Sequence, residues 1–182
     1  MNHQEYLHLS ARTSNQENDP AALYLHGIIG MISERGEIRD VQDEVNAIEE
    51  IGDVLWYLAC CHRATGRNVD DLLAGGISTH ADDFALLHHL SSAADIAKRW
   101  WMYGATPKRL SEAADQADRI ATEIISIALN VLSDRDNVGE ILSKARAINI
   151  AKLLKRYPKK FTEDCALIRD LGLERKTMEA MT

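Results

Sequence analysis

The amino-acid sequence predicts an all-α fold, and three observations support this prediction. Only 3 Pro and 10 Gly occur in 182 residues, whereas sandwiches and barrels need frequent turns. Long segments are rich in Ala, Leu, Ile, Glu and Arg, a composition that favours helices. Within these segments apolar residues recur with the period of one helix face. We expect a single domain over residues 1–182, with a four-helix-bundle-like core built from two helix hairpins.

The first hairpin is expected within residues 21–75. The first 20 residues are polar, and Ser14–Pro20 reads as a loop. The first helix should therefore run over about Ala21–Asp40, and the second over about Gln42–Thr65, where a glycine follows. A short third helix is expected over Asn68–Leu73.

A second helical block is expected over residues 77–145. Its helices should cover Phe84–Tyr103 and Ser111–Leu132. A further helix, Asn137–Leu154, should end before the Tyr-Pro pair that follows it. The last segment, Glu163–Leu171, is short and amphipathic.

The two blocks resemble each other. A shift of 69 residues lays Ile51 on Ile120 and Ala59 on Ala128. This match suggests a degenerate duplication of a helix pair. The alternative is chance, because any two amphipathic helices followed by a turn align in part.

Charge and cysteine content indicate which partners to expect. Asp and Glu number 28 against 21 Lys and Arg, a formal charge of −7, which argues against a nucleic-acid polymer as partner. The three cysteines form no disulfide framework, and neither a signal peptide nor a membrane-spanning apolar run is present. We therefore expect a cytoplasmic protein without a membrane partner.

Four acidic residues form the most informative pattern. Glu34 and Glu37 are three apart in the first predicted helix, and Glu50 and Asp53 are three apart in the second. Each pair shares a helix face, and the short turn between the helices lets the two pairs converge. Converging carboxylates repel one another unless a cation neutralises them, and oxygen ligands suit Mg²⁺ or Mn²⁺. The alternative is a solvated acidic face paired with neighbouring arginines.

The motif Glu34-x-x-Glu37, twelve residues, then Glu50-x-x-Asp53 resembles the signature of the all-α nucleoside triphosphate pyrophosphohydrolases, the MazG-like superfamily. The flanking residues 26–37 and 49–59 are similar to the same two helices of that family. A late segment also resembles bacterial and phage members; it reads Asn149-x-x-Lys152-Leu153-x-x-Arg156-Tyr157-Pro158, followed by Phe161.

The resemblance implies an enzyme that cleaves a nucleoside triphosphate between its α and β phosphates, releasing a monophosphate and pyrophosphate. It implies Mg²⁺ as cofactor, with the carboxylates of Glu34, Glu37, Glu50 and Asp53 as ligands; the motif does not fix which of them activates the attacking water. Residues 146–171 form a basic segment expected to bind the phosphates.

Within that segment Asn149, Lys152 and Arg156 share one helix face and are the candidate phosphate ligands. His26 matches the start of the family's first helix and is expected to line the site. Four other histidines are read as surface residues: His3, His8, His62 and His80.

The second block departs from the signature, because the shift of 69 residues lays Glu50 on Arg119 and Asp53 on Thr122. A second metal site is therefore not expected.

The resemblance to the MazG-like superfamily, which includes dimeric members, implies a homo-oligomer, most simply a two-fold dimer. Five aromatic residues could stack on a base or pack in the core or an interface: Trp56, Tyr57, Trp100, Trp101 and Tyr103.

Two other functions stay open. One is a dimeric dUTPase-type enzyme with the same chemistry and a pocket selective for uracil nucleotides. The other is a non-enzymatic helical module, whose acidic cluster would bind a basic partner or a regulatory metal ion.

Overall fold

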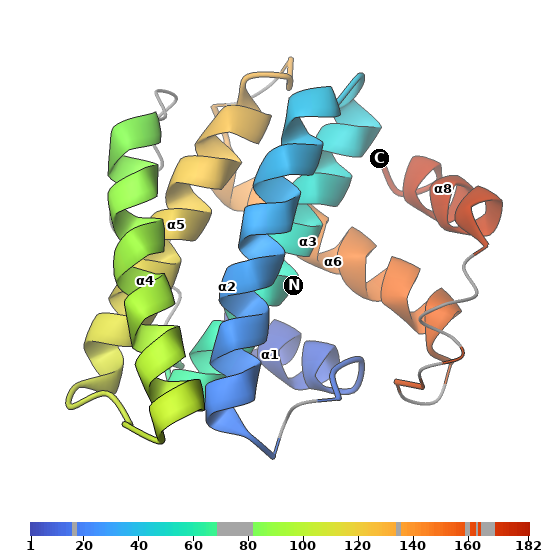
Figure 1. Ribbon diagram of the computed structural model, residues 1–182. Coiled ribbons are helices and arrows are strands. Elements are labelled where there is room, and N and C mark those ends of the chain that lie inside the picture. Colours follow the sequence, from blue (N-terminus) through green and yellow to red (C-terminus); the bar gives the residue numbers. More distant parts are fainter. Residues whose placement is uncertain (16–17, 69–81, 134–135, 159–160, 163, 165–169) are drawn as a thin grey trace.

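The computed structural model describes residues 1–182 except 16–17, 69–81, 134–135, 159–160, 163 and 165–169 (Figure 1). Over the described residues every regular element is helical, which confirms the predicted all-α class. The helices are α1 (His3–Ala11), α2 (Pro20–Glu37), α3 (Glu44–Thr65), α4 (Asp83–Tyr103), α5 (Leu110–Leu129), α6 (Val138–Arg156) and α8 (Leu171–Glu179), with the 3₁₀ turn η1 (Ile38–Asp40) after α2.

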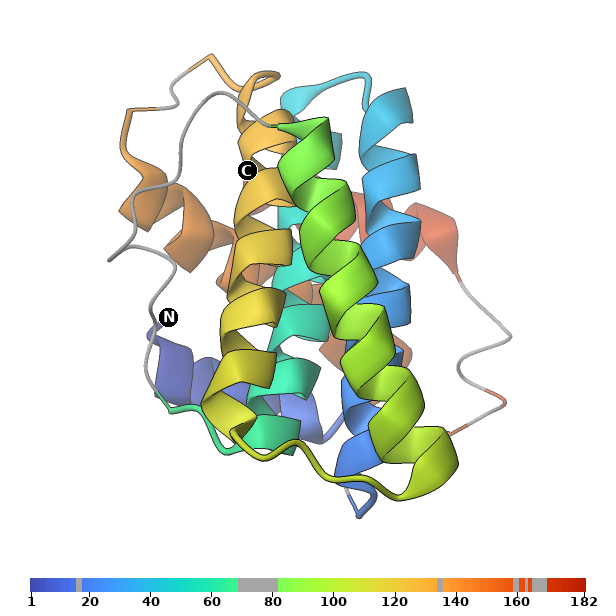
Figure 2. The same cartoon turned by 60° about the vertical axis from the view of Figure 1, so that its left-hand side comes forward.

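Helices α2 to α5 form the predicted four-helix core from two hairpins (Figure 2). Helix α2 packs on α3, α4 packs on α5, and the hairpins join through contacts of α3 with α5 and of α2 with α4. Helix α3 is the most central, with buried residues on nearly every face, because α6 also covers it. Small and branched side chains, such as Ala121 and Ile124 of α5, fill the space between these helices.

Local sequence signals set the helix ends. The Asp19 carboxylate accepts hydrogen bonds from the backbone N–H groups of Ala21 and Ala22, and Pro20 is the first helical residue of α2. Helix α3 ends at Gly66, which adopts the left-handed conformation (φ 73°) that glycine tolerates best. The predicted ends of these helices therefore agree with the structure to within a few residues.

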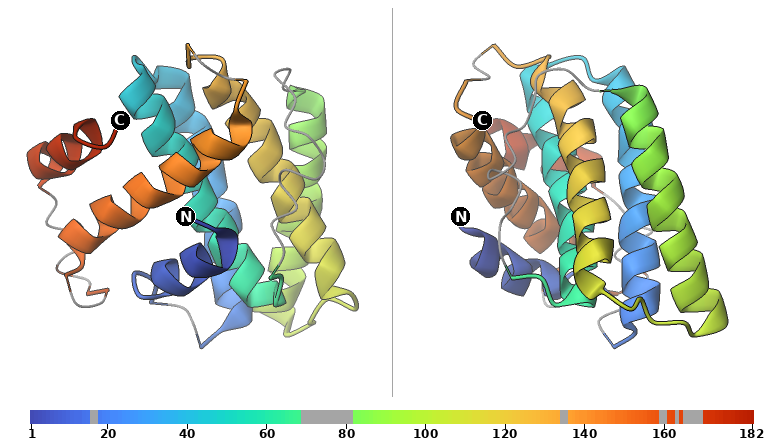
Figure 3. Two further views of the ribbon diagram at one scale, coloured as in Figure 1. Left: turned by 180° about the vertical axis from the view of Figure 1, so that it is seen from behind. Right: turned by 90° about the vertical axis from the view of Figure 1, so that its left-hand side faces the viewer.

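Helices α1, α6 and α8 lie outside the four-helix core. Seen from behind, α6 crosses α3 obliquely, α8 lies against α6, and α1 lies below α6 (Figure 3). Helix α1 corrects the sequence prediction, which placed the first helix at Ala21. The expected helices at Asn68–Leu73 and Glu163–Leu171 fall almost wholly outside the described residues.

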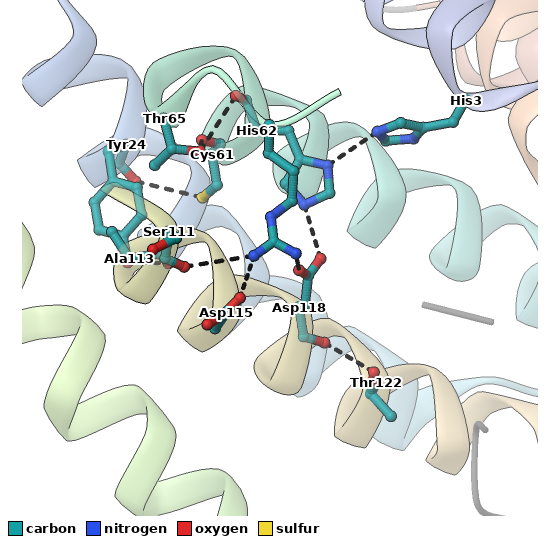
Figure 4. A network of polar contacts seen from close by, with 11 residues as sticks. His3, Tyr24, Cys61, His62, Thr65, Ser111, Ala113, Asp115, Asp118 and Thr122 are labelled. Atoms are coloured by element: carbon teal, nitrogen blue, oxygen red, sulfur yellow. Dashed lines mark hydrogen bonds and ion pairs between the residues drawn. The ribbon is translucent and has the colours of Figure 1, made fainter. Parts of the chain in front are cut away.

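A buried polar network ties α1 to the core (Figure 4). His62 of α3 lies between His3 of α1, with 3.1 Å between their ring nitrogens, and Asp118 of α5, 2.7 Å away. Arg67 adds an ion pair to Asp118 at 2.9 Å. The prediction that His3 and His62 are surface residues is therefore wrong: both are buried, because each ring finds its hydrogen-bond partners on another helix. His8 is exposed as predicted, and His80 lies outside the described residues.

No described helix combines the length and the apolar character needed to span a membrane.

Candidate metal centre and adjoining pocket

The hairpin of α2 and α3 brings three of the four predicted carboxylates together. Glu34 comes from α2, and Glu50 and Asp53 come from one face of α3. Each offers an oxygen atom, and these atoms all lie within 4.8 Å of one another. In the part of the chain that the structure describes, no other group of acidic, histidine or cysteine side chains converges in this way.

The fourth predicted carboxylate, Glu37, is exposed at the end of α2 and is not part of this triad. Its charge still acts on the triad, since it contributes to raising the pKa values of Glu34 and Glu50. Glu37 and Glu50 also line one shallow surface pocket together with Asp40. Glu37 therefore lies at the solvent side of the acidic cluster.

Glu34 is the most buried carboxylate of the triad. Its side chain is only 6% exposed, and its Oε2 atom is buried without a hydrogen-bond partner among the described residues. Burial and then the charge of Asp53 raise the pKa of Glu34 to about 10, and Glu34 shares a hydrogen bond with Glu50. Burial also raises the pKa of Glu50 to about 7. A divalent cation would relieve this repulsion and satisfy the unpartnered oxygen.

The donor set fits a hard cation. All three converging groups are carboxylates, the ligand type that Mg²⁺ and Mn²⁺ prefer, and no thiolate or imidazole belongs to the triad. Glu34, Glu50 and Asp53 are thus the residues that could hold Mg²⁺.

Two of the predicted phosphate ligands, Asn149 and Lys152, contact Asp53. The Lys152 ammonium lies 2.7 and 2.5 Å from the two Asp53 oxygens and 3.2 Å from Glu49. The Asn149 amide donates to Asp53 Oδ1 at 2.6 Å. Burial lowers the pKa of Lys152, but the charges of Asp53 and Glu49 outweigh it, and the pKa rises overall. Lys152, 1% exposed, is therefore a buried cation that partly neutralises the cluster.

Gly52 allows α6 to approach this closely. A Cβ atom at Gly52 would lie 3.0 Å from both the Ala145 carbonyl oxygen and Asn149 Cβ on α6. The absence of a side chain here brings Asn149 and Lys152 within hydrogen-bond distance of Asp53.

Arg156 lies one helical turn beyond Lys152 and is paired with a residue that sequence reasoning missed. Its guanidinium donates two hydrogen bonds, of 2.8 and 2.7 Å, to the buried Glu174 carboxylate of α8. This bidentate geometry is characteristic of strong arginine–carboxylate pairs. Arg156 thus fixes α8 against α6 and also lines the pocket beside the acidic triad.

A pocket of about 150 Å³ adjoins the triad, and Asp53 is part of its wall. His26, predicted to line the site, packs edge-to-face against Trp56 and Tyr57, with both pairs of ring centroids 5.5 Å apart. Burial lowers the pKa of His26, which favours the neutral ring. The remaining lining residues are Thr13, Ser14, Asn15, Leu153, Arg156, Tyr157 and Phe161.

The pocket wall joins segments from both ends of the chain. The Trp56 indole donates to Thr13 Oγ1 at 2.9 Å, and the backbone N–H of Phe161 donates to the Arg12 carbonyl at 3.1 Å. Sequence reasoning missed the contribution of residues 13–15, because nothing local marks a short polar loop as a pocket wall. Among the other predicted aromatic candidates, Trp100 is in the core and Trp101 is exposed, and neither lines this pocket.

Comparisons with protein-family models, curated proteins and solved structures found no match to this chain. The resemblance to the MazG-like superfamily is therefore a prediction that depends on the sequence motifs.

Proposed function

We propose that this protein is a Mg²⁺-dependent nucleoside triphosphate pyrophosphohydrolase. The observation that carries the proposal is the convergence of Glu34, Glu50 and Asp53 beside an aromatic pocket. In the proposed reaction, water attacks the α phosphate, the bond between the α phosphorus and the bridging oxygen breaks, and the products are a nucleoside monophosphate, pyrophosphate and a proton.

The metal would supply charge neutralisation and activation of the attacking water. Glu34, Glu50 and Asp53 would hold it, with Mn²⁺ as an alternative ion. Glu37, at the solvent side of the cluster, would complete the ligand set or accept the proton from the attacking water.

The aromatic pocket is proposed to hold the base. Its volume of about 150 Å³ is below the ~300–1,000 Å³ of sites for drug-sized ligands and suits a single planar ring system. Tyr57 and Trp56 offer ring surfaces for stacking. Because Asp53 lines the same pocket, a nucleotide whose base is bound there would have its phosphates close to the acidic triad.

Cationic side chains are proposed to stabilise the triphosphate. Lys152 and Arg156 lie on the same side of α6, and each is already paired with a carboxylate, so the substrate would share these cations with Asp53 and Glu174. Asn149 would act together with Lys152.

The test is a panel of canonical and oxidised nucleoside triphosphates with separate detection of pyrophosphate and orthophosphate. We expect pyrophosphate in the presence of Mg²⁺ or Mn²⁺ and none with EDTA. Asp53→Asn should lower the rate by roughly 100-fold or more, because it removes a charged metal ligand. Asp95→Asn, an exposed acid of α4 paired with Lys98, is the matched control and should keep full activity.

Other outcomes would change the assignment. Hydrolysis limited to uracil nucleotides would favour the dUTPase-type alternative. Orthophosphate as the first product would overturn the proposed cleavage between the α and β phosphates. No hydrolysis of any nucleotide with either metal would overturn the proposal in favour of a non-enzymatic module.

We also propose that the chain forms a homodimer. Apolar side chains of α2 and α4, Ile29, Ile32, Phe84 and Leu87, are exposed. The Arg35–Asp83 ion pair (3.1 Å) joins the end of α2 to the start of α4, so these side chains belong to neighbouring helices. Several exposed apolar side chains on neighbouring helices are typical of a protein–protein interface.

A further inference from the structure

A chain of two hydrogen bonds, one buried and one partly buried, leads from α1 to the candidate metal ligand Asp53. The Tyr6 hydroxyl donates to Asn149 Oδ1 at 2.8 Å, and Asn149 Nδ2 donates to Asp53 Oδ1 at 2.6 Å. Tyr6 is 143 positions from Asn149 in the sequence and lies outside the motifs that resemble the family. The hydroxyl also lies 3.2 Å from the Gly52 carbonyl oxygen, a longer contact.

Because Tyr6 and Asn149 are buried, each of their polar atoms must find its hydrogen-bond partner within the protein. Tyr6 and Asn149 are both almost completely buried, so solvent does not satisfy either end of the Asn149 amide. Because the Asp53 carboxylate accepts from Nδ2, the Asn149 carbonyl oxygen must find its donor on the opposite side, and Tyr6 supplies it. Burial, followed by the charge of Asp53, raises the pKa of Tyr6, which keeps its hydroxyl protonated.

We infer that Tyr6 is a positioning residue for the metal centre: through Asn149 it orients the Asp53 carboxylate toward Glu34 and Glu50. The inference depends on the metal site of the proposed function. Groups that hydrogen-bond to a metal ligand and fix its orientation strongly affect the affinity for the metal, even though they do not touch the ion. Helix α1, anchored by the His3–His62 contact, thereby becomes part of the site.

The test is a Mn²⁺ titration of the full chain without nucleotide, with free Mn²⁺ followed by electron paramagnetic resonance. Tyr6→Phe keeps the ring and removes the hydroxyl, and we expect the Kd for Mn²⁺ to rise by about tenfold, the lower end of the range for such second-layer partners. Tyr24→Phe is the matched control. Tyr24 is equally buried, and its hydroxyl donates to the Ala113 carbonyl at 3.0 Å, so this variant loses one buried hydrogen bond elsewhere. Its Kd should not change.

A double-mutant cycle checks that Tyr6 acts through Asn149. In an Asn149→Ala background, Tyr6→Phe should cause no further rise in the Kd, because the connecting amide is already missing. A tenfold rise in that background would overturn the proposed route. An unchanged Kd in the single Tyr6→Phe variant, even with a lower melting temperature, would show a merely structural role and overturn the inference.

The proposed function can fail separately. Mn²⁺ binding that depends on Tyr6, in a protein that hydrolyses no nucleotide, would refute the enzyme and leave the positioning role standing. A wild-type protein that binds no Mn²⁺ would overturn both.

Discussion

Glu34 illustrates how surroundings determine the chemistry of a single residue. On an exposed helix it would be an ordinary ionised acid, but here α3 covers it and directs Glu50 and Asp53 at it. Burial and neighbouring charge raise its pKa to about 10. Without a cation the folded protein therefore holds a proton that the unfolded chain would release.

The raised pKa of Glu34 predicts that Glu34→Gln changes the free energy of unfolding in a pH-dependent way. Because the folded-state pKa is raised, the stability contributed by protonated Glu34 is complete below the unfolded value of 4.5 and is lost as the pH rises towards about 10. Gln mimics the protonated form at every pH. In EDTA the variant should therefore exceed wild type in free energy of unfolding by about 1–3 kcal/mol at pH 8 and match it near pH 4.5. Urea denaturation at both pH values measures this.

The same variant should lose stabilisation by metal. Saturating Mg²⁺ should stabilise wild type by about 2–3 kcal/mol at a concentration near 100 times the Kd, and the gain should shrink at acid pH as the ligands become protonated. Glu34→Gln should gain far less. A variant that is less stable than wild type in EDTA at pH 8, or equally stabilised by Mg²⁺, would contradict the assignment of Glu34.

At the scale of elements, the contact between α3 and α6 determines which side chains reach the acidic cluster. Both atoms nearest to a Cβ at Gly52 belong to α6, so the helix would have to move as a unit. That movement would withdraw Asn149 and Lys152 from Asp53.

Gly52→Ala should therefore destabilise the protein by roughly 1–2 kcal/mol, because overpacking outweighs the better helix propensity of Ala. Gly36→Ala in α2 is the matched control: a Cβ there meets nothing within 4 Å, and the substitution should stabilise by up to about 1 kcal/mol. Thermal unfolding distinguishes the two. Equal stabilisation of both variants would contradict the close approach of α6.

At the scale of the whole molecule, the exposed apolar residues of α2 and α4 predict the proposed assembly. Ile32 is 45% exposed and Phe84 87% exposed. In light scattering after size exclusion, wild type should have twice the 20.3 kDa mass of one chain. Ile32→Lys should weaken the dimer without loss of helical circular dichroism, since the side chain is not in the core.

Leu171→Lys is the control for this experiment, because Leu171 is an exposed apolar residue of α8 rather than of α2 or α4. The Leu171→Lys variant should remain dimeric. A wild-type protein with the mass of one chain would refute the assembly.

Much of the core could be predicted because its signals are local. Apolar periodicity, a polar loop before α2 and a glycine after α3 each act within a few residues, and they located the helices of both hairpins. Helix α1 could not be predicted in the same way. Its buried positions include His3 and Ser10, polar residues whose partners lie far away in the sequence.

The sequence by itself determined the all-α class and the placement of Glu34, Glu50 and Asp53 on facing helices, because helical spacing fixes which side chains share a face. The tertiary structure decided which groups meet. It left Glu37 at the solvent side, paired Lys152 with Asp53 and Arg156 with Glu174, and brought Tyr6 behind Asn149. These contacts join helices far apart in the chain, and their energies depend on burial and on packing between helices, which no local pattern encodes.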